Sequence, residues 1–307
     1  MTGTPAAGPA HGTAGDAPPV IDTALVRRLV DTRFPQWRDL PLTPVRPGGS
    51  DHVIHRLGDE LSVRLPRRAD VLGQARKEAE WLPRLAPHLP LAVPVPVEVG
   101  EPAHGYPWPW AVTRWLDGEQ AGAEGLAGSA EAAVRLAGFL AALQRFAPES
   151  VPALGGRADL TGGTAAGRDD ATRAAIAATS GVFDAGAMTE LWDATLRAPG
   201  WQRPAVWFHG DFHTGNLLTS GGRLSAVIDF GGLGIGDPAC DLMIAFTLLS
   251  ARSRAVFRDA LDVDDATWLR GRGWALATGL NAYTAYAAVD ARVAAQTTRQ
   301  IRAALAG

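Results

Sequence analysis

Two polar clusters interrupt apolar segments in the C-terminal half of the chain, and their side chains are of types that can do chemistry. The first lies in WFHGDFHTGNLL (207–218), which contains Asp211 and Asn216. The second follows the apolar segment LSAVI and begins with Asp229, ahead of FGGLGIGDP. A carboxylate and an amide oxygen are hard ligands that suit Mg²⁺ with bound phosphates. If Asn216 and Asp229 hold the metal, Asp211 is left to orient and deprotonate an attacking hydroxyl. These are the parts that phosphoryl transfer needs.

Two other interpretations of the first cluster compete with this one. His209, Asp211 and His213 alternate along the chain and are compatible with a hydrolytic zinc site. Such a site usually recruits further histidine ligands, and no histidine follows His213 in the sequence. Asp211 and Asn216 are also residue types that satisfy backbone amides in a polar turn. The second cluster, placed one strand later, favours phosphoryl transfer over both alternatives.

Short strands must position these clusters. AVWFHG (205–210) and LSAVIDF (224–230) are predicted to be strands that bracket the first cluster, together with a turn at 220–222. In an antiparallel hairpin the second strand returns to the start of the first. We therefore expect Asp229 to face the loop that runs from Asp211 to Asn216.

The N-terminal half predicts a small antiparallel sheet with one helix between residues 40 and 116. Alternating apolar residues indicate its strands, and prolines place the third strand at an edge. The predicted elements are a helix over 21–34 capped by Asp22, a hairpin of HVIHRL (52–57) and ELSVRL (60–65) about Gly58-Asp59, a helix over 69–89, and strands in LAVPVPVEVG (91–100) and PWPWAVTRWL (107–116).

The remainder of the chain is predicted to be mainly helical. Helices are expected over 127–147, over 173–196 and in a series from Asp237 to Ala306, with an irregular Gly-rich stretch over 150–172. The fold class is therefore α+β, with two lobes. A small β-sheet lobe spans 20–116, a larger helical lobe spans 117–307, and a hinge lies near residue 116. Residues 1–19 are rich in Ala, Gly, Pro and Thr and predict a disordered tail rather than a signal peptide.

Composition excludes several classes of protein. The 307 residues are 47% apolar and 20% charged, with a net charge of -3. This balance gives no electrostatic argument for a nucleic-acid partner. No apolar run approaches the roughly 20 residues that span a bilayer, so no membrane association is expected. Cys240 is the one cysteine, which permits no internal disulfide and fits a reducing cytoplasm. The oligomeric state does not follow from the sequence.

The two clusters together resemble a known family. HGDFHTGNLL followed by VIDFGGLGIGDPACDL is similar to the aminoglycoside phosphotransferase family, within the choline-kinase and protein-kinase-like fold. The resemblance covers roughly residues 40–300 in the order of elements. It implies a bilobal kinase-like fold with Asp211 as the catalytic aspartate and Asn216 and Asp229 as the ligands of Mg²⁺.

The resemblance also assigns supporting roles in the two clusters. It implies that His209 supports the backbone of the loop. His213 is common at its position and is not expected to be catalytic. Asp237 and Asp241 are expected to cap and brace the helix that follows them.

The resemblance further implies a nucleotide site in the smaller lobe, with ATP or GTP as the phosphoryl donor. Arg64 stands where the family usually has lysine, and it keeps the charge but brings a bulkier, fixed fork of donors. Glu78 borders the buried stripe of its helix and is the carboxylate expected to hold Arg64. The other expected nucleotide contacts are Ser50 and Asp51 in the loop over the phosphates, Thr113, Arg114, Trp115 and Leu116 in the hinge, and Leu218 and Ile228 on the pocket floor.

The expected activity is transfer of a phosphoryl group from ATP or GTP to a hydroxyl of a small molecule, with an antibiotic as the best candidate. The final stretch ARVAAQTTRQIRAALAG has arginines and no acidic residue, which disfavours a typical aminoglycoside. Macrolide, nucleoside or peptide antibiotics remain open. The alternatives are a metabolite alcohol kinase of the choline, homoserine or sugar type, and a non-catalytic nucleotide-binding relic. Tryptophans that could line a flat pocket, or simply belong to the core, are Trp81, Trp108, Trp110, Trp115, Trp201 and Trp207.

Overall fold

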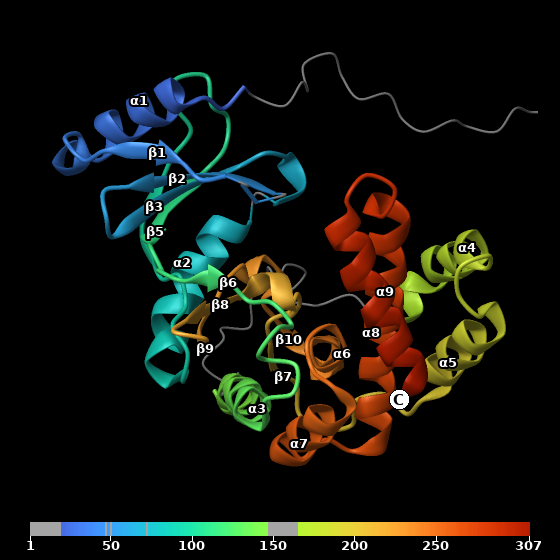
Figure 1. Cartoon of the computed structure of the whole chain (residues 1–307). Coiled ribbons are helices and arrows are strands. Elements are labelled where there is room, and N and C mark those ends of the chain that lie inside the picture. The colour runs from blue at the N-terminus through green and yellow to red at the C-terminus, as the bar shows by residue number, and fades with distance from the viewer. Residues whose placement is uncertain (1–19, 47, 50, 72, 147–164) are drawn as a thin grey trace, which may run out of the picture.

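The structure is a computed structural model that describes residues 20–307 except 47, 50, 72 and 147–164. A smaller part that contains a sheet lies beside a larger, mainly helical part (Figure 1). Some predictions fall outside the described residues: the tail over 1–19, the contact of Ser50 and most of the Gly-rich stretch.

A five-stranded antiparallel sheet forms the smaller part, in the order β1-β2-β3-β5-β4. Its strands are β1 (Leu42–Pro44), β2 (His52–Leu57), β3 (Leu61–Pro66), β4 (Pro96–Gly100) and β5 (Trp110–Arg114). The predicted hairpin about Gly58-Asp59 is β2–β3. β4 lies at an edge, as its prolines predict, because proline cannot donate a hydrogen bond to a second neighbouring strand.

Two helices pack against this sheet. α1 (Thr23–Arg33) begins at the predicted cap, where the carboxylate of Asp22 accepts a hydrogen bond from a first-turn N–H at 2.7 Å. α2 (Gln74–Leu85) covers only the middle of the predicted helix over 69–89, because short 3-10 turns replace both ends. Pro87 lacks the N–H that would extend α2 further.

The chain has two hydrophobic cores, and α2 contributes to the larger one. The smaller core lies between α1 and the sheet and includes the buried Val63 and Trp110. The larger core is built mainly by the helical part, but it also contains Trp81 and Leu82 from α2. Since α2 also packs on β4, it joins the sheet to the helical part (Figure 1).

Short strands between the two parts carry the polar clusters, and here one prediction is wrong. β7 (Val206–Phe208) does not pair with the strand that precedes Asp229, but with β10 (Gly234–Gly236). The hairpin is formed instead by β8 (Leu217–Ser220) and β9 (Arg223–Val227). The first cluster contains the start of that hairpin, because Leu217 and Leu218 already belong to β8. β6 (Glu119–Gln120) adds a third strand on the free side of β8.

Helices complete the larger part. They are α3 (Ala130–Arg145), α4 (Asp169–Thr179), α5 (Ala185–Arg197), α6 (Met243–Thr247), α7 (Ala251–Leu261), α8 (Asp265–Tyr286) and α9 (Ala291–Ala306). The single helix predicted over 173–196 is two helices, because Asp184 caps a new start through the N–H of Ala187 at 3.0 Å. Within the described chain, every helix is too short or too polar to cross a membrane.

Candidate active site

The β8–β9 hairpin brings the two polar clusters to one place. Asn216 immediately precedes β8, and Asp229 lies two residues after the end of β9. The N–H of Ile228 donates to the carbonyl of Asn216 at 2.9 Å, so the two chain segments remain paired up to the clusters. Convergence is therefore achieved by the strand that follows the first cluster rather than by the one before it.

Asp211 and Asn216 contact each other directly. The Asn216 side-chain amide donates to the carbonyl of Asp211 at 2.9 Å and to its carboxylate at 3.0 Å. Both hydrogens of the amide are thus used on Asp211, while Asn216 itself is 7% exposed. The Oδ1 atom of Asn216 accepts no hydrogen bond from any described residue. This leaves a free acceptor oxygen beside the carboxylate, which suits a hard cation.

The backbone of the loop from His209 to Asn216, the 209–216 loop, is fixed by two buried side chains. Asp241 accepts hydrogen bonds from the N–H groups of His209 at 2.7 Å and Gly210 at 2.8 Å. The ring of His209 bonds to the carbonyl of Ile228 at 3.1 Å and accepts from the N–H of Asp211 at 3.2 Å. Burial raises the pKa of Asp241 to about 7, although the two backbone donors oppose that rise.

These hydrogen bonds test the roles that were expected for Asp237, Asp241 and His209. Asp237 caps the short 3-10 helix Pro238–Leu242 through the N–H of Ala239 at 3.0 Å, as predicted, but Asp241 braces the 209–216 loop instead of the helix. Both ring nitrogens of His209 are used on the backbone, so it has none left for zinc. Among the described residues, no three His, Cys, Asp or Glu side chains form a metal-binding group.

Two residues adopt left-handed backbone conformations where the clusters meet. Gly210 has φ +85°, and a Cβ there would lie 2.1 Å from the carbonyl oxygen of Gly232. Asp229 has φ +63°, which is uncommon for a residue with a side chain. The 209–216 loop therefore packs directly against the backbone that follows Asp229, and only glycine fits at position 210.

His213 contacts Asp211, although its position in the sequence does not predict this contact. The Nδ1 atom of His213 accepts from the N–H of Gly215 at 3.0 Å, so Nε2 carries the proton and faces the carboxylate of Asp211 at 3.4 Å. Burial lowers the pKa of His213, but the hydrogen bond and charge of Asp211 outweigh it and the net shift is upward. For Asp211, burial raises the pKa, but the His213 contact and the Asn216 hydrogen bond bring it below the usual value. Asp211 is therefore ionised at neutral pH, as a base must be.

An ion pair from the smaller part reaches the same place. Arg64 on β3 donates to Glu78 on α2 at 2.8 Å, and its second nitrogen lies 4.0 Å from the carboxylate of Asp229. The side chains of Arg64 and Glu78 are 11% and 3% exposed, while Asp229 remains 43% exposed. Burial raises the pKa of Glu78 in spite of the adjacent Arg64 guanidinium. The arginine fork thus joins the helix carboxylate to the second cluster.

Lys77 is a further residue that sequence reasoning missed. Its ammonium donates to the carbonyls of Gly231 at 2.7 Å and Leu233 at 3.0 Å, which follow Asp229 in the chain. No motif indicates this, because the contact joins residues more than 150 positions apart. α2 thus contacts the second cluster through Lys77, and it contacts the sheet through the bond of Glu78 with Arg64 on β3. Asp51, expected near the phosphates, is paired with Arg68 at 3.1 Å.

Comparison with known proteins now identifies the family. A sequence model of the phosphotransferase enzyme family matches residues 41–279. The chain belongs to this family. A comparison with curated protein sequences finds no match.

Solved structures of antibiotic phosphotransferases share the fold. The GDP complex of wild-type aminoglycoside 2'-phosphotransferase-IIIa has a TM-score of 0.70 and 18% identity, covering 93% of this chain and 99% of that one. The macrolide 2'-phosphotransferase MphH from Brachybacterium faecium, an apoenzyme, has a TM-score of 0.59 and 25% identity, covering 92% and 96%. A ternary complex of an aminoglycoside 2''-phosphotransferase with streptomycin and ATP has a TM-score of 0.59 and 14% identity, covering 93% and 99%. The bilobal, kinase-like α+β fold is therefore confirmed, and the chain is a phosphotransferase with a hydroxyl group as acceptor.

In the segment expected to bind the nucleobase, most of the hydrogen-bonding groups already bond to other residues of this phosphotransferase. Thr113 is fully buried and its hydroxyl bonds to that of Ser62 at 2.7 Å. The N–H groups of Arg114 and Trp115 donate to backbone carbonyls within the smaller part, at 2.9 and 2.7 Å. The N–H of Leu116 donates to no described residue. Of the three expected backbone donors, only that of Leu116 remains for a ligand.

The floor of the expected nucleotide pocket is half-buried. Leu218 on β8 pairs with Gln120 on β6, and Ile228 follows β9. Both side chains are partly exposed rather than enclosed in the core. Their position next to Asn216 and Asp229 is compatible with contact to a nucleotide.

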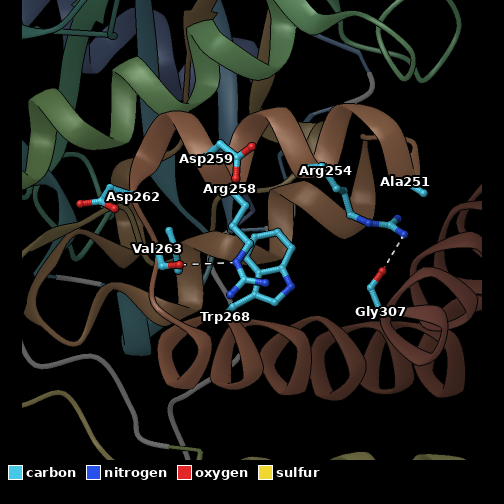
Figure 2. A pocket seen from close by; sticks show the side chains of 9 residues that line it. Ala251, Arg254, Arg258, Asp259, Asp262, Val263, Trp268 and Gly307 are labelled. Carbon is cyan, nitrogen blue, oxygen red and sulfur yellow. Dashed lines mark hydrogen bonds between the residues drawn. The ribbon is translucent and has the colours of Figure 1, made fainter.

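Two of the cavities of this phosphotransferase are lined mainly by its helical part. One, of about 900 Å³, is lined by Gly210 and Gly232 on one side and by residues of α5 and α8 on the other. A second, of about 560 Å³, lies on α7 and is lined by Arg254, Arg258 and Trp268 (Figure 2). Its arginines bond to backbone carbonyls at 3.1 and 3.4 Å. The first cavity touches the 209–216 loop, whereas the second is built from other elements.

Proposed function

We propose that this enzyme transfers the γ-phosphoryl group of ATP or GTP to a hydroxyl of a small molecule, and that its acceptor is an antibiotic. The observation that carries the proposal is the carboxylate of Asp211, held by Asn216 at 3.0 Å beside a free amide oxygen and Asp229. The printed names of the solved relatives support the acceptor class, since they are aminoglycoside and macrolide phosphotransferases. Complexes of those relatives with GDP and ATP support a nucleoside triphosphate as donor.

Asp211 is the proposed general base. The acceptor hydroxyl gives its proton to the carboxylate while its oxygen forms a bond to the γ-phosphorus. The bond from that phosphorus to the bridging oxygen breaks, and the nucleoside diphosphate leaves. Since Asn216 and His213 fix the carboxylate and keep it ionised, the base needs no rearrangement before it acts.

The remaining residues bind and position the donor. The free Oδ1 of Asn216 and the partly exposed carboxylate of Asp229 fit Mg²⁺, which would neutralise phosphate charge when bound. Arg64, held by Glu78 at 2.8 Å, is proposed to contact phosphate oxygens of the nucleotide. The N–H of Leu116 is proposed to bind the nucleobase of the donor. This residue set also argues against a non-catalytic relic, because a relic has no need to keep the base and both metal ligands.

Replacement of Asp211 by asparagine tests the assignment of the base. Asp211→Asn keeps the shape of the side chain but removes the carboxylate that accepts the proton. We expect the phosphorylation rate, measured as nucleoside diphosphate formed in the presence of an acceptor, to fall at least about 10³-fold. Binding of Mg²⁺-ATP or Mg²⁺-GTP, measured by calorimetry, should remain within a few-fold of wild type.

A matched control is available on the same loop. Thr214→Val removes a hydroxyl that bonds to Thr247 at 3.2 Å, away from Asp211, and should leave most of the activity. Full activity of Asp211→Asn would overturn the assignment. A wild-type protein that binds nucleotide but consumes none with any hydroxyl compound would support the relic instead.

A further inference from the structure

The cavity of about 900 Å³ beside the 209–216 loop is lined by more basic than acidic residues. Its described lining contains four basic residues, Lys77, Arg168, Arg203 and Arg270. Asp237 is the acidic residue of that lining. Gly210, which directly precedes Asp211 in the chain, forms part of the wall. The cavity therefore extends to the backbone beside the proposed base, although the side chain of Asp211 is not part of its lining.

The carboxylate of Asp237 is already neutralised. Arg270 donates to its two oxygens at 2.8 and 3.2 Å, and a helix N–H uses it as well. The other donors of Arg270, which is buried, bond to the carbonyl of Pro199 and to the hydroxyl of Thr267. The described lining thus offers no free carboxylate to a cationic ligand. An ammonium group placed there would lose its hydration without gaining a partner.

Arg168, at the start of α4, forms no ion pair with a described residue. Its guanidinium lies over the ring of Trp274 on α8 at 4.8 Å, and no described carboxylate lies within ion-pair distance. A second pair of the same kind, Arg203 over Trp201 at 5.5 Å, lines the cavity too, although Arg203 also contacts Asp264 at 3.4 Å. Stacked Arg–Trp pairs present flat apolar surface together with donors for an anion.

We propose that this cavity binds the acceptor, and that the acceptor combines a planar apolar part with an anionic group, such as a carboxylate, and a hydroxyl. The anionic group pairs with Arg168, the planar part packs on Trp274 or Trp201, and the hydroxyl reaches Asp211 past Gly210. A polycationic acceptor is excluded by the same charges. The inference rests on the proposed function, because it assigns the substrate class of that site.

A pair of compounds that differ in one group tests this assignment. 4-Methylumbelliferyl β-D-glucuronide and the matching β-D-glucoside share a planar ring and sugar hydroxyls, but only the glucuronide has a carboxylate. Calorimetry with the full chain should show the glucuronide binding about tenfold more tightly than the glucoside, as expected for one charge-assisted hydrogen bond. Kanamycin, a polycation, should bind more weakly than both and should not compete.

Variants of two arginines, one at the start of α4 and one within it, test whether Arg168 causes the preference for the glucuronide. Arg168→Gln should remove the preference for the glucuronide and leave binding of the glucoside unchanged, which also shows that the variant is folded. Arg173→Gln is the control, because Arg173 lies on α4 outside the cavity and pairs with Asp193 at 2.7 Å. It should keep the tenfold preference. The comparison of the two compounds on the wild-type chain needs no variant at all.

The outcomes separate this inference from the proposed function. Kanamycin binding tighter than the glucuronide, equal binding of the two compounds, or no binding of either would overturn the acceptor class, even if phosphoryl transfer is found elsewhere. Tight, Arg168-dependent binding of the glucuronide to Asp211→Asn supports the cavity assignment independently of turnover. If that binding is present but no hydroxyl compound is ever phosphorylated by the wild type, the proposed function fails while the binding site stands.

Discussion

At the scale of single residues, Asp211 owes its state to neighbours on its own loop. Asn216 donates both hydrogens of its side-chain NH2 group to Asp211, and His213 places its proton toward the carboxylate at 3.4 Å. Both contacts favour the ionised form, and together they outweigh a burial that would otherwise raise the pKa of Asp211. The carboxylate of Asp211, the proposed base, is therefore already ionised before a substrate binds.

Gly210 allows these side chains to lie where they do. Glycine can be required there by the left-handed backbone or by the close contact with Gly232, and a comparison with a second left-handed glycine separates the two reasons. Gly210→Ala brings a Cβ to within 2.1 Å of the carbonyl oxygen of Gly232, on a backbone with φ +85°. We expect a loss of at least about 3 kcal/mol in the free energy of unfolding and loss of activity. Urea denaturation and nucleotide turnover measure the two effects.

Gly221 provides the control for this prediction. It has φ +57° in the β8–β9 turn, but nothing lies within 4 Å of an added Cβ. Gly221→Ala should therefore cost only about 1 kcal/mol and keep the activity. Equal losses in the two variants would show that backbone conformation alone, and not the contact with Gly232, requires glycine at position 210.

The residue types of the site could be predicted from the sequence, but several of their contacts could not. Asp211, Asn216 and Asp229 stand at spacings that imply a shared site. Asp241 and Lys77 lack such a signal. Asp241 contacts backbone N–H groups some 30 residues earlier in the chain, and Lys77 contacts carbonyl groups, which carry no side-chain identity. Backbone contacts of this kind appear only once the chain is folded.

At the scale of elements, α2 and β3 connect the smaller part to the clusters. β3 carries Arg64 and α2 carries Glu78, while α2 also holds the segment after Asp229 through Lys77. The sequence predicts the wrong first strand for the hairpin because β7 and β8 are both short and apolar, and only β8 has a tight turn before its partner. Pairing of β7 with β10 joins two segments separated by a whole hairpin, which local patterns do not reveal.

Arg64→Lys tests what the arginine fork contributes between these elements. Arginine reaches Glu78 at 2.8 Å and comes within 4.0 Å of Asp229 with separate nitrogens, whereas lysine has one nitrogen and can serve only one of them well. We expect kcat/KM for the nucleotide to fall about tenfold, with the melting temperature nearly unchanged because the charge beside buried Glu78 is kept.

Arg67→Lys, at the exposed end of β3, is the matched control and should behave as wild type. A drop of similar size in both variants would assign the effect to β3 as a whole. An Arg64→Lys enzyme with unchanged kcat/KM for the nucleotide would contradict the proposed contact between Arg64 and the nucleotide.

At the scale of the whole molecule, the α+β class with a small sheet and a larger helical part follows from periodicity, because long helices and alternating strands are the patterns that sequence reveals best. The division at residue 116 remains a proposal. Helix ends were less predictable: proline shortens α2, and the Asp184 cap divides the helix expected over 173–196. α2 packs on β4 of the sheet and contributes Trp81 and Leu82 to the larger core, so loss of the sheet should also destabilise the helical part.

Buried histidines in the sheet make the stability of the molecule depend on pH. His52 on β2 is 5% exposed, and burial, followed by the charges of Arg64 and Arg67, lowers its pKa from 6.5 to about 3. Burial lowers the pKa of His55 on the same strand as well. In the unfolded chain these rings take up protons below about pH 6.5, whereas the folded sheet resists protonation. Their contribution to stability is therefore full above pH 6.5 and declines as the pH falls towards 3.

His52→Gln isolates one of these contributions. By linkage, a shift from pH 7.5 to pH 5 should cost the wild type about 2 kcal/mol of unfolding free energy through His52 alone. The variant has no ring to protonate, so its unfolding free energy should fall by about that much less over the same interval. Urea denaturation of both proteins at both pH values gives the difference, and His88→Gln, an exposed histidine on the same part, is the control that should follow the wild type. Parallel losses in all three proteins would mean that protonation elsewhere drives acid unfolding and that the sheet tolerates a charged His52.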